Sequence, residues 1–133
     1  QAAATATATP WRYVKLALWP PDRAGLAARI ATRFGRMLEA GLVAEVEKLR
    51  ARPDIHGELP SMRAVGYRQV LGYLEGRYEL AEAERRAVVA TRQLAKRQLT
   101  WLRAEEGLFV LKTETDPKAA AVVEIRSKIA QPL

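Results

Sequence analysis

The residues best suited to chemistry are arginines and a lysine that recur at helical spacing between residues 80 and 105. Arg85, Arg92, Lys96 and Arg103 fall within about 40° of each other on a helical wheel. The adjoining arc, up to about 140°, holds a second polar set: Arg86, Gln93, Arg97 and Thr100. Because a planar guanidinium can grip a phosphate and stack on a base, the stripe predicts contact with a polyanion, foremost nucleic acid.

The positive charge of the chain is concentrated around this stripe. The 22 Lys and Arg residues outnumber 15 Asp and Glu, which gives a net charge of +7. Residues 63–103 alone hold nine cations, eight of them arginine, against four acids. No acid lies between Arg85 and Arg103, so almost no neutralising i, i+4 pairing is expected. The alternative interpretation is an ordinary solvated helix face.

Composition excludes several function classes. The chain has no cysteine and one histidine, His56, which excludes disulfides, thiol catalysis and cysteine-based zinc sites, and we expect His56 at the surface. The absence of cysteine fits a reducing, cytoplasmic location. No run approaches the roughly 20 apolar residues that span a bilayer, so we expect no membrane association. The 133 residues suit one domain, but 24 of the apolar residues are alanine, a thin supply for a core.

Two more positions could meet a ligand. Arg33 lies about 20° from the apolar arc of its predicted helix, where a guanidinium either turns out to solvent or is held to meet an anion. Gly66 lies inside a predicted helix, which indicates close approach of a ligand or of another helix. Trp19 and Trp101 are expected to be packing residues.

The predicted fold is mostly α with one or two short β-strands. Residues 1–11 are a low-complexity Ala/Thr segment expected to be a flexible linker, followed by a helical region over 12–133. The predicted elements are strands at 13–19 and 108–112 and helices at 23–38, 42–51, 62–74, 80–105 and 117–130. Ser61 is the expected N-cap of the third helix.

Three stretches, in this order and spacing, resemble the C-terminal part of bacterial tRNA dimethylallyltransferase. The first is Arg29-Ile30 with Arg33, Met37, Gly41-Leu42 and Glu45-Val46; the second is Arg63-Ala64-Val65-Gly66-Tyr67-Arg68-Gln69 with Tyr73-Leu74-Glu75-Gly76; the third is Ala90-Thr91-Arg92-Gln93-Leu94-Ala95-Lys96-Arg97-Gln98-Leu99-Thr100-Trp101-Leu102-Arg103. The resemblance covers about residues 12 to 112, and its last motif is highly specific.

The resemblance implies a function and site residues. Enzymes of this family move a dimethylallyl group from dimethylallyl diphosphate to N6 of the adenine 3′-adjacent to the anticodon. Arg33 is then implied as a catalytic residue that contacts the diphosphate. The implied tRNA-binding residues are Arg63, Ala64, Val65, Gly66, Tyr67, Arg68, Arg92, Lys96, Arg97, Gln98, Leu99, Thr100, Trp101, Leu102 and Arg103.

The chain departs from the family pattern at its N-terminal side. The family fold is a P-loop-like α/β core with a helical insertion, and no G-x-x-x-x-G-K-[ST] loop occurs in this sequence. The resemblance therefore implies that the phosphate loop, the catalytic base and most ligands of Mg²⁺ lie outside this chain. We expect these residues alone to bind no metal and to be inactive.

The expected partners are a tRNA anticodon stem-loop, dimethylallyl diphosphate and the N-terminal part of the same enzyme, which is expected to be a monomer when complete. Two alternatives remain open at this point. One is a stand-alone RNA-binding helical module without catalysis. The other is a structural helical domain whose basic face only keeps it soluble.

Overall fold

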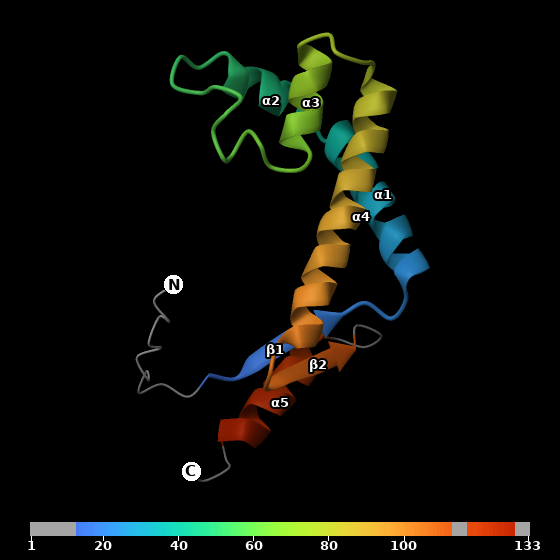
Figure 1. Cartoon of the computed structure of the whole chain (residues 1–133), viewed down its shortest axis with the longest axis vertical. Helices are drawn as coiled ribbons and strands as arrows, with labels where there is room; N and C mark the ends of the chain where they lie inside the picture. Colours follow the sequence, from blue (N-terminus) through green and yellow to red (C-terminus); the bar gives the residue numbers. More distant parts are fainter. Residues whose placement is uncertain (1–12, 113–116, 130–133) are drawn as a thin grey trace, which may run out of the picture. The chain divides into compact units, whose positions relative to one another are not determined.

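The computed structural model describes residues 13–112 and 117–129, so the predicted linker over residues 1–11 lies outside the described residues. The chain divides into a helical unit, Asp22–Arg103, and a smaller unit formed by residues that flank it on both sides. Figure 1 shows the order of the elements. The mostly helical fold with two short strands agrees with the prediction.

The helical unit consists of four helices, α1 (Arg23–Glu39), α2 (Leu42–Arg50), α3 (Tyr67–Leu74) and α4 (Leu80–Ala104). The side chain of Asp22 caps α1 by accepting a hydrogen bond from Gly25 N at 2.5 Å. Gly41, at φ +99°, separates α1 from α2, as expected for a position that favours glycine. These boundaries agree with the predicted ones within one or two residues, apart from the start of α3.

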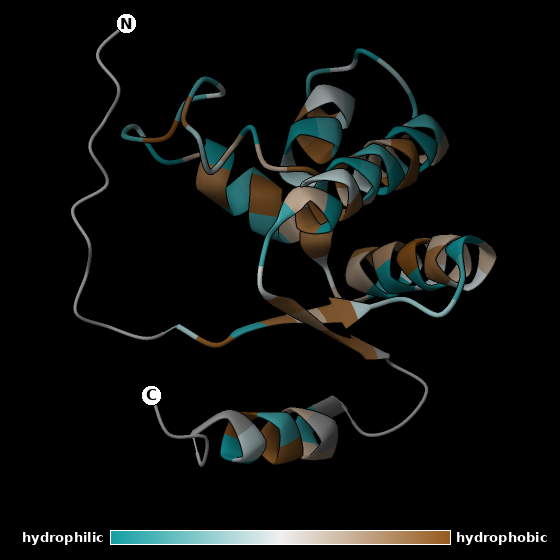
Figure 2. Ribbon diagram, turned by 60° about the horizontal axis from the view of Figure 1, so that its bottom comes forward, coloured by the Kyte–Doolittle hydropathy of each residue, from teal (hydrophilic) through white to brown (hydrophobic). Residues whose placement is uncertain are grey.

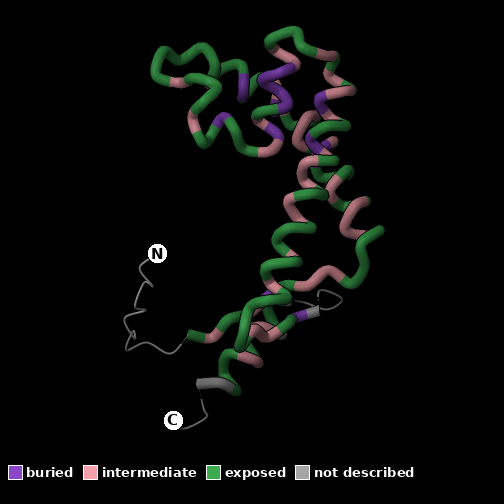
Figure 3. The backbone as a smooth tube through the Cα atoms, viewed as in Figure 1, coloured by how far each residue is buried: buried purple, intermediate pink, exposed green. Residues whose placement is uncertain are grey.

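The core of the helical unit forms where all four helices meet. Its buried residues are Phe34, Leu42, Val46, Met62, Val70, Leu71 and Ala87. Within this unit, Figure 3 shows the buried segments gathered around α2, α3 and the first turns of α4. The later turns of α4 contribute no residue to the core, and Trp101 is 69% exposed. The expectation that Trp101 packs is therefore wrong for the described chain, in which most of its side chain is exposed.

The third predicted helix begins later than its sequence indicates. Residues 61–66 form turns rather than helix, and α3 begins at Tyr67 with Gly66 as its N-cap, so Ser61 is not the cap. Gly66 has φ +99° and ψ −64°, a backbone conformation that side chains with a Cβ disfavour. Position 66 therefore favours glycine because this turn requires a positive φ, and Gly66 does not lie inside a helix.

The smaller unit contains a two-stranded sheet and α5 (Pro117–Ile129), which contacts β2. β1 (Lys15–Trp19) and β2 (Leu108–Lys112) pair in parallel, with Lys15 opposite Leu108 and Trp19 opposite Lys112. Figure 2 shows that both strands are largely apolar. Leu18 and Val110 are nevertheless 57% and 52% exposed, although strands of parallel sheets are usually covered on both faces.

Within the ranges 13–112 and 117–129, none of the helices is both long and apolar enough to cross a membrane.

Replacing Gly66 with alanine is expected to destabilise the helical unit by at least about 1 to 2 kcal/mol, because its positive φ strains any residue with a Cβ. The matched control is Gly35→Ala in α1, where an added Cβ would find no atom closer than 4.0 Å. That control should stabilise the chain by up to about 1 kcal/mol. Urea unfolding followed by circular dichroism measures both; equal stabilities for the two variants would contradict the assignment of the turn.

Candidate nucleic-acid interface

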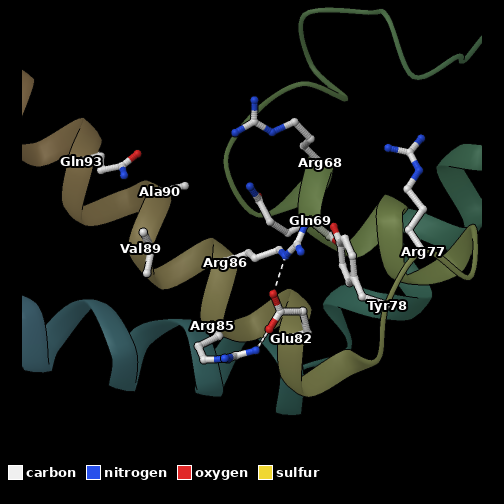
Figure 4. Close-up of a pocket in the computed structure, with 10 residues that line it drawn as sticks. All are labelled: Arg68, Gln69, Arg77, Tyr78, Glu82, Arg85, Arg86, Val89, Ala90 and Gln93. Carbon is white, nitrogen blue, oxygen red and sulfur yellow. Dashed lines mark hydrogen bonds and ion pairs between the residues drawn. The ribbon is translucent and has the colours of Figure 1, made fainter.

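The first basic surface is an open hollow of about 630 Å³ between α3, the following turn and α4, called here the α3–α4 hollow. Its lining residues are Arg68, Gln69, Arg77, Tyr78, Glu82, Arg85, Arg86, Val89, Ala90 and Gln93. Figure 4 shows Arg68 and Arg86 reaching toward the hollow from α3 and α4. Four arginines thus surround one carboxylate, and the surplus of positive charge suits a phosphate-bearing ligand.

The single acid of the hollow, Glu82, pairs with two arginines of its own helix. Its carboxylate accepts a hydrogen bond from Arg86 Nε at 2.6 Å and forms an ion pair with Arg85. The expectation that almost no salt bridge neutralises the cations is therefore wrong for Arg85 and Arg86. Glu82 lies just before the acid-free stretch that begins at Arg85 and pairs with both arginines. Arg92, Lys96 and Arg97 form no ion pair with another residue that the structure describes.

A hydrogen-bonded chain ties the wall of the hollow to the Gly66 turn. The Tyr78 hydroxyl donates to the backbone oxygen of Gln69 at 3.0 Å, and the Gln69 side-chain Oε1 accepts from Gly66 N at 2.8 Å. Gln69 is only 5% exposed and is the one buried polar residue among those that the structure describes. Its amide therefore satisfies a backbone N–H that water cannot easily reach and holds the turn between Arg63 and the first residues of α3, which include Arg68.

The glycine of α3 makes room for this arrangement. A Cβ built on Gly72 would overlap the hydroxyl of Tyr78, so the tyrosine can lie against α3 only because residue 72 has no side chain.

The second basic surface is a groove of about 460 Å³ between α1 and α4, called here the α1–α4 groove. Its apolar lining residues are Leu26, Ala27, Ile30, Val89, Ala95 and Leu99, and its polar ones are Arg23, Arg92, Gln93, Lys96 and Arg103. Val89 and Gln93 line both the groove and the hollow, so the two basic surfaces adjoin along α4.

Five of the fifteen predicted tRNA-binding residues line these surfaces. Arg68 lines the hollow, whereas Arg92, Lys96, Leu99 and Arg103 line the groove. Ten of the fifteen are exposed: Arg63, Ala64, Arg68, Arg92, Lys96, Arg97, Gln98, Thr100, Trp101 and Arg103. Val65, Tyr67, Leu99 and Leu102 are half-buried, and Gly66 is buried. The buried glycine can act on a ligand only through the turn that it shapes.

Arg33 is exposed and lines neither surface. In the described chain its side chain is turned to solvent, where the guanidinium is accessible to an anion. His56 is also exposed, as expected.

Tyr67 is linked to α2 through its hydroxyl, which donates a hydrogen bond to the carboxylate of Glu45. This hydrogen bond, with a smaller contribution from burial, raises the pKa of Tyr67 above its ordinary value. The hydrogen bond links the first turn of α3 to α2.

Sequence reasoning missed the residues that support the hollow, namely Gln69, Tyr78 and Glu82 as partners of the predicted cations. Two signals could have found them. Gln69 lies three residues after Gly66, the spacing at which a side chain reaches back to the N-cap backbone N–H. Glu82 lies four residues before Arg86, the spacing of a helical ion pair.

The described residues contain no group of three or more His, Asp or Glu side chains that could hold a metal ion.

Comparison with known proteins identifies the family. A model of the IPP transferase family matches residues 1–105, a range that includes the segment predicted to be a linker. The chain belongs to the IPP transferase family. Two relatives of this IPP transferase chain are named tRNA dimethylallyltransferase: one from Bordetella pertussis, 52% identical over 120 residues, and one from Thioalkalivibrio sulfidiphilus, 49% identical over 126 residues.

Solved structures share the fold of this IPP transferase chain. The tRNA isopentenylpyrophosphate transferase of Bacillus halodurans superimposes on 93% of the chain with a TM-score of 0.78 and 34% identity. That of Staphylococcus epidermidis superimposes on 87% with a TM-score of 0.77 and 27% identity. The chain covers 40% and 37% of these two proteins, respectively.

The chain also spans less than half the length of the curated relatives. It aligns over 90% of its own residues with 38% of the Bordetella pertussis protein, and over 95% with 39% of the Thioalkalivibrio sulfidiphilus protein.

Replacing Gln69 with alanine should destabilise this IPP transferase chain by about 1 to 3 kcal/mol, because it leaves the backbone N–H of Gly66 without its acceptor. Gln69→Glu retains an acceptor at the same position and should recover most of the stability. The exposed Gln93→Ala is the control and should stay within about 0.5 kcal/mol. Urea unfolding measures the free energy of unfolding of each variant. A Gln69→Ala chain as stable as the control would contradict the role of the amide.

Proposed function

We propose that this chain is the C-terminal part of a tRNA dimethylallyltransferase. The complete enzyme transfers the dimethylallyl group of dimethylallyl diphosphate to N6 of the adenine 3′-adjacent to the anticodon, in the cytoplasm. The observation that carries the proposal is the 52% identity to a tRNA dimethylallyltransferase. The basic surfaces along α4 support it, because Arg92, Lys96 and Arg97, which form no ion pair with another described residue, suit an RNA backbone.

In this reaction the adenine N6 forms a bond to C1 of the dimethylallyl group while the C1–O bond to the diphosphate breaks. Pyrophosphate leaves with the electron pair of that bond, and N6 loses a proton to a base outside this chain. Charge accumulates on the departing pyrophosphate, and a guanidinium aimed at it would stabilise that charge. We assign this role to Arg33, which the resemblance implies and which has an exposed guanidinium with no ion pair to another described residue.

The tRNA is bound, in this proposal, by residues 63–68, which comprise the end of the turn and the start of α3, and by the cations of α4. The anticodon loop presents unpaired bases, so the target adenine can be turned out of its stack at small cost before it reacts. Monomeric action and Mg²⁺ ligands supplied from outside this chain are part of the same proposal.

The role of Arg33 is tested in a chimera in which residues 1–133 replace the matching part of the Bordetella pertussis relative. Arg33→Ala should lower kcat/KM for prenyl transfer to an anticodon stem-loop by about 10²- to 10³-fold, because one charge-stabilising group is removed. Affinity for the RNA should not change. Arg36→Ala, an exposed arginine one turn further along α1, is the control. Full activity of Arg33→Ala in an active chimera would remove this role.

The tRNA-facing role of α4 is tested with the 133-residue chain and a synthetic anticodon stem-loop. Replacing Arg92 or Lys96 with alanine should reduce the slope of log K against log salt concentration by about 0.7 to 0.9 for each phosphate that the variant no longer neutralises. Lys48→Ala, which removes an exposed cation of α2, should leave the slope unchanged.

The same binding measurement separates the enzyme from its alternatives. RNA affinity of the chain together with prenyl transfer by the chimera supports the enzyme. RNA affinity with an inactive chimera favours a binding module without catalysis, and no RNA affinity even at low salt favours a structural domain.

A further inference from the structure

The guanidinium of Arg86 is held on one edge and open on the other. Its Nε donates to Glu82 Oε1 at 2.6 Å, and its central carbon lies 4.4 Å from the centroid of the Tyr78 ring. No residue of the described chain accepts a hydrogen bond from its two terminal nitrogens. These two nitrogens form a fork that matches two oxygens of a phosphate, so the side chain keeps one bidentate edge available.

Arg86 is therefore oriented before a ligand arrives. The carboxylate of Glu82 fixes the position of Nε, while the ring of Tyr78 fixes the plane of the guanidinium by cation–π contact. Tyr78 is in turn anchored to α3, because its hydroxyl donates to Gln69 O and Gly72 leaves space for it. A preorganised donor loses less conformational entropy on binding than a freely rotating one.

Arg86 lines the α3–α4 hollow together with Arg68 of α3 (Figure 4). Arg77 and Arg85 also line the hollow, where Arg77 forms an ion pair with Glu75 and Arg85 forms one with Glu82. The hollow adjoins the α1–α4 groove through Gln93, so the cationic surface continues beyond it. A continuous row of cations favours a chain of phosphates over a single free anion.

We propose that Arg86 binds a backbone phosphate of RNA in the α3–α4 hollow, and that Glu82 and Tyr78 are the positioning residues that hold its guanidinium. This inference rests on the proposed function, which supplies an RNA substrate. Arg86 is then a phosphate-binding residue that lies outside the motifs of the resemblance. Glu82 and Tyr78, which the resemblance leaves without a role, support it.

The phosphate contact is tested by replacing Arg86 with glutamine and measuring affinity for the anticodon stem-loop across a salt series. The slope of log K against log salt should fall by about 0.7 to 0.9, the change expected when one phosphate is no longer neutralised. The control is Arg52→Gln: this arginine also pairs with one carboxylate, that of Asp54, and its side chain is 58% exposed against 56% for Arg86. Arg52 lines neither surface, so its variant should match the wild type. Equal slopes for Arg86→Gln and the wild type overturn the proposal.

The positioning role is tested by two variants of Glu82 that carry the same charge. Both Glu82→Gln and Glu82→Ala raise the net charge by one, but only glutamine retains an acceptor for Arg86 Nε. Glu82→Gln should bind the stem-loop at least about fivefold more tightly than Glu82→Ala, a factor that corresponds to one modest hydrogen bond. If charge alone matters, the two affinities will be equal, which overturns the positioning role.

A structural role for Arg86 would show itself differently. Thermal unfolding of each variant measures stability, whereas the salt slope measures the number of phosphates neutralised. Arg86→Lys keeps the charge but not the fork, so its slope should stay near the wild-type value while its affinity falls severalfold. If Arg86→Gln lowers the stability but leaves the salt slope unchanged at temperatures where the variant is folded, Arg86 has a structural role and the proposal is contradicted.

Failure of the proposed function and failure of the role of Arg86 give different results. If the wild-type chain has no RNA affinity and the wild-type chimera is inactive, the proposed function fails and the role of Arg86 fails with it. If the wild type binds RNA and Arg86→Gln binds with the same affinity and slope, the inference about Arg86 alone is overturned.

Discussion

Burial of a few side chains where four helices meet determines the arrangement of the helical unit. Phe34 from α1, Val46 from α2, Val70 from α3 and Ala87 from α4 are buried together. Every positioned group of the α3–α4 hollow depends on this contact, because it holds α3 against the first turns of α4. Apolar burial does not fix orientations by itself. The hydrogen bonds from Tyr78 to Gln69 and from Gly66 to Gln69 therefore fix the orientation of these side chains within the packed unit.

Away from this contact the chain leaves much apolar surface uncovered. Leu26, Ile30 and Leu99 are only half-buried in the α1–α4 groove, Trp101 is exposed, and both strands expose large apolar side chains. Scattered exposed apolar residues are ordinary, but contiguous apolar surface usually meets a partner. The chain aligns with about two fifths of its relatives' length. The small number of large apolar residues in the sequence is consistent with this incomplete burial.

The sequence was sufficient to predict the helices with strong periodicity and the two strands, because alternation and capping are local properties. It was not sufficient for the turn at residues 61–66. Ser61 is an ordinary helix cap by residue type, and only contact with α1 and the amide of Gln69 selects a turn with Gly66 at positive φ. The cations of α4 were predictable for the same local reason. Their division between a hollow and a groove was not, because it depends on which helices pack against each side of α4.

The parallel pairing of β1 with β2 has a consequence for how the chain folds. The two strands are separated by residues 20–107, which contain the whole helical unit. Closing a flexible loop of this length would cost roughly 4 kcal/mol of chain entropy, more than a pair of five-residue strands readily returns. Helices form from local contacts and fold quickly, whereas pairing between distant strands is slow. The helical unit is therefore expected to fold first, and the sheet then closes between the ends of an element that is already compact.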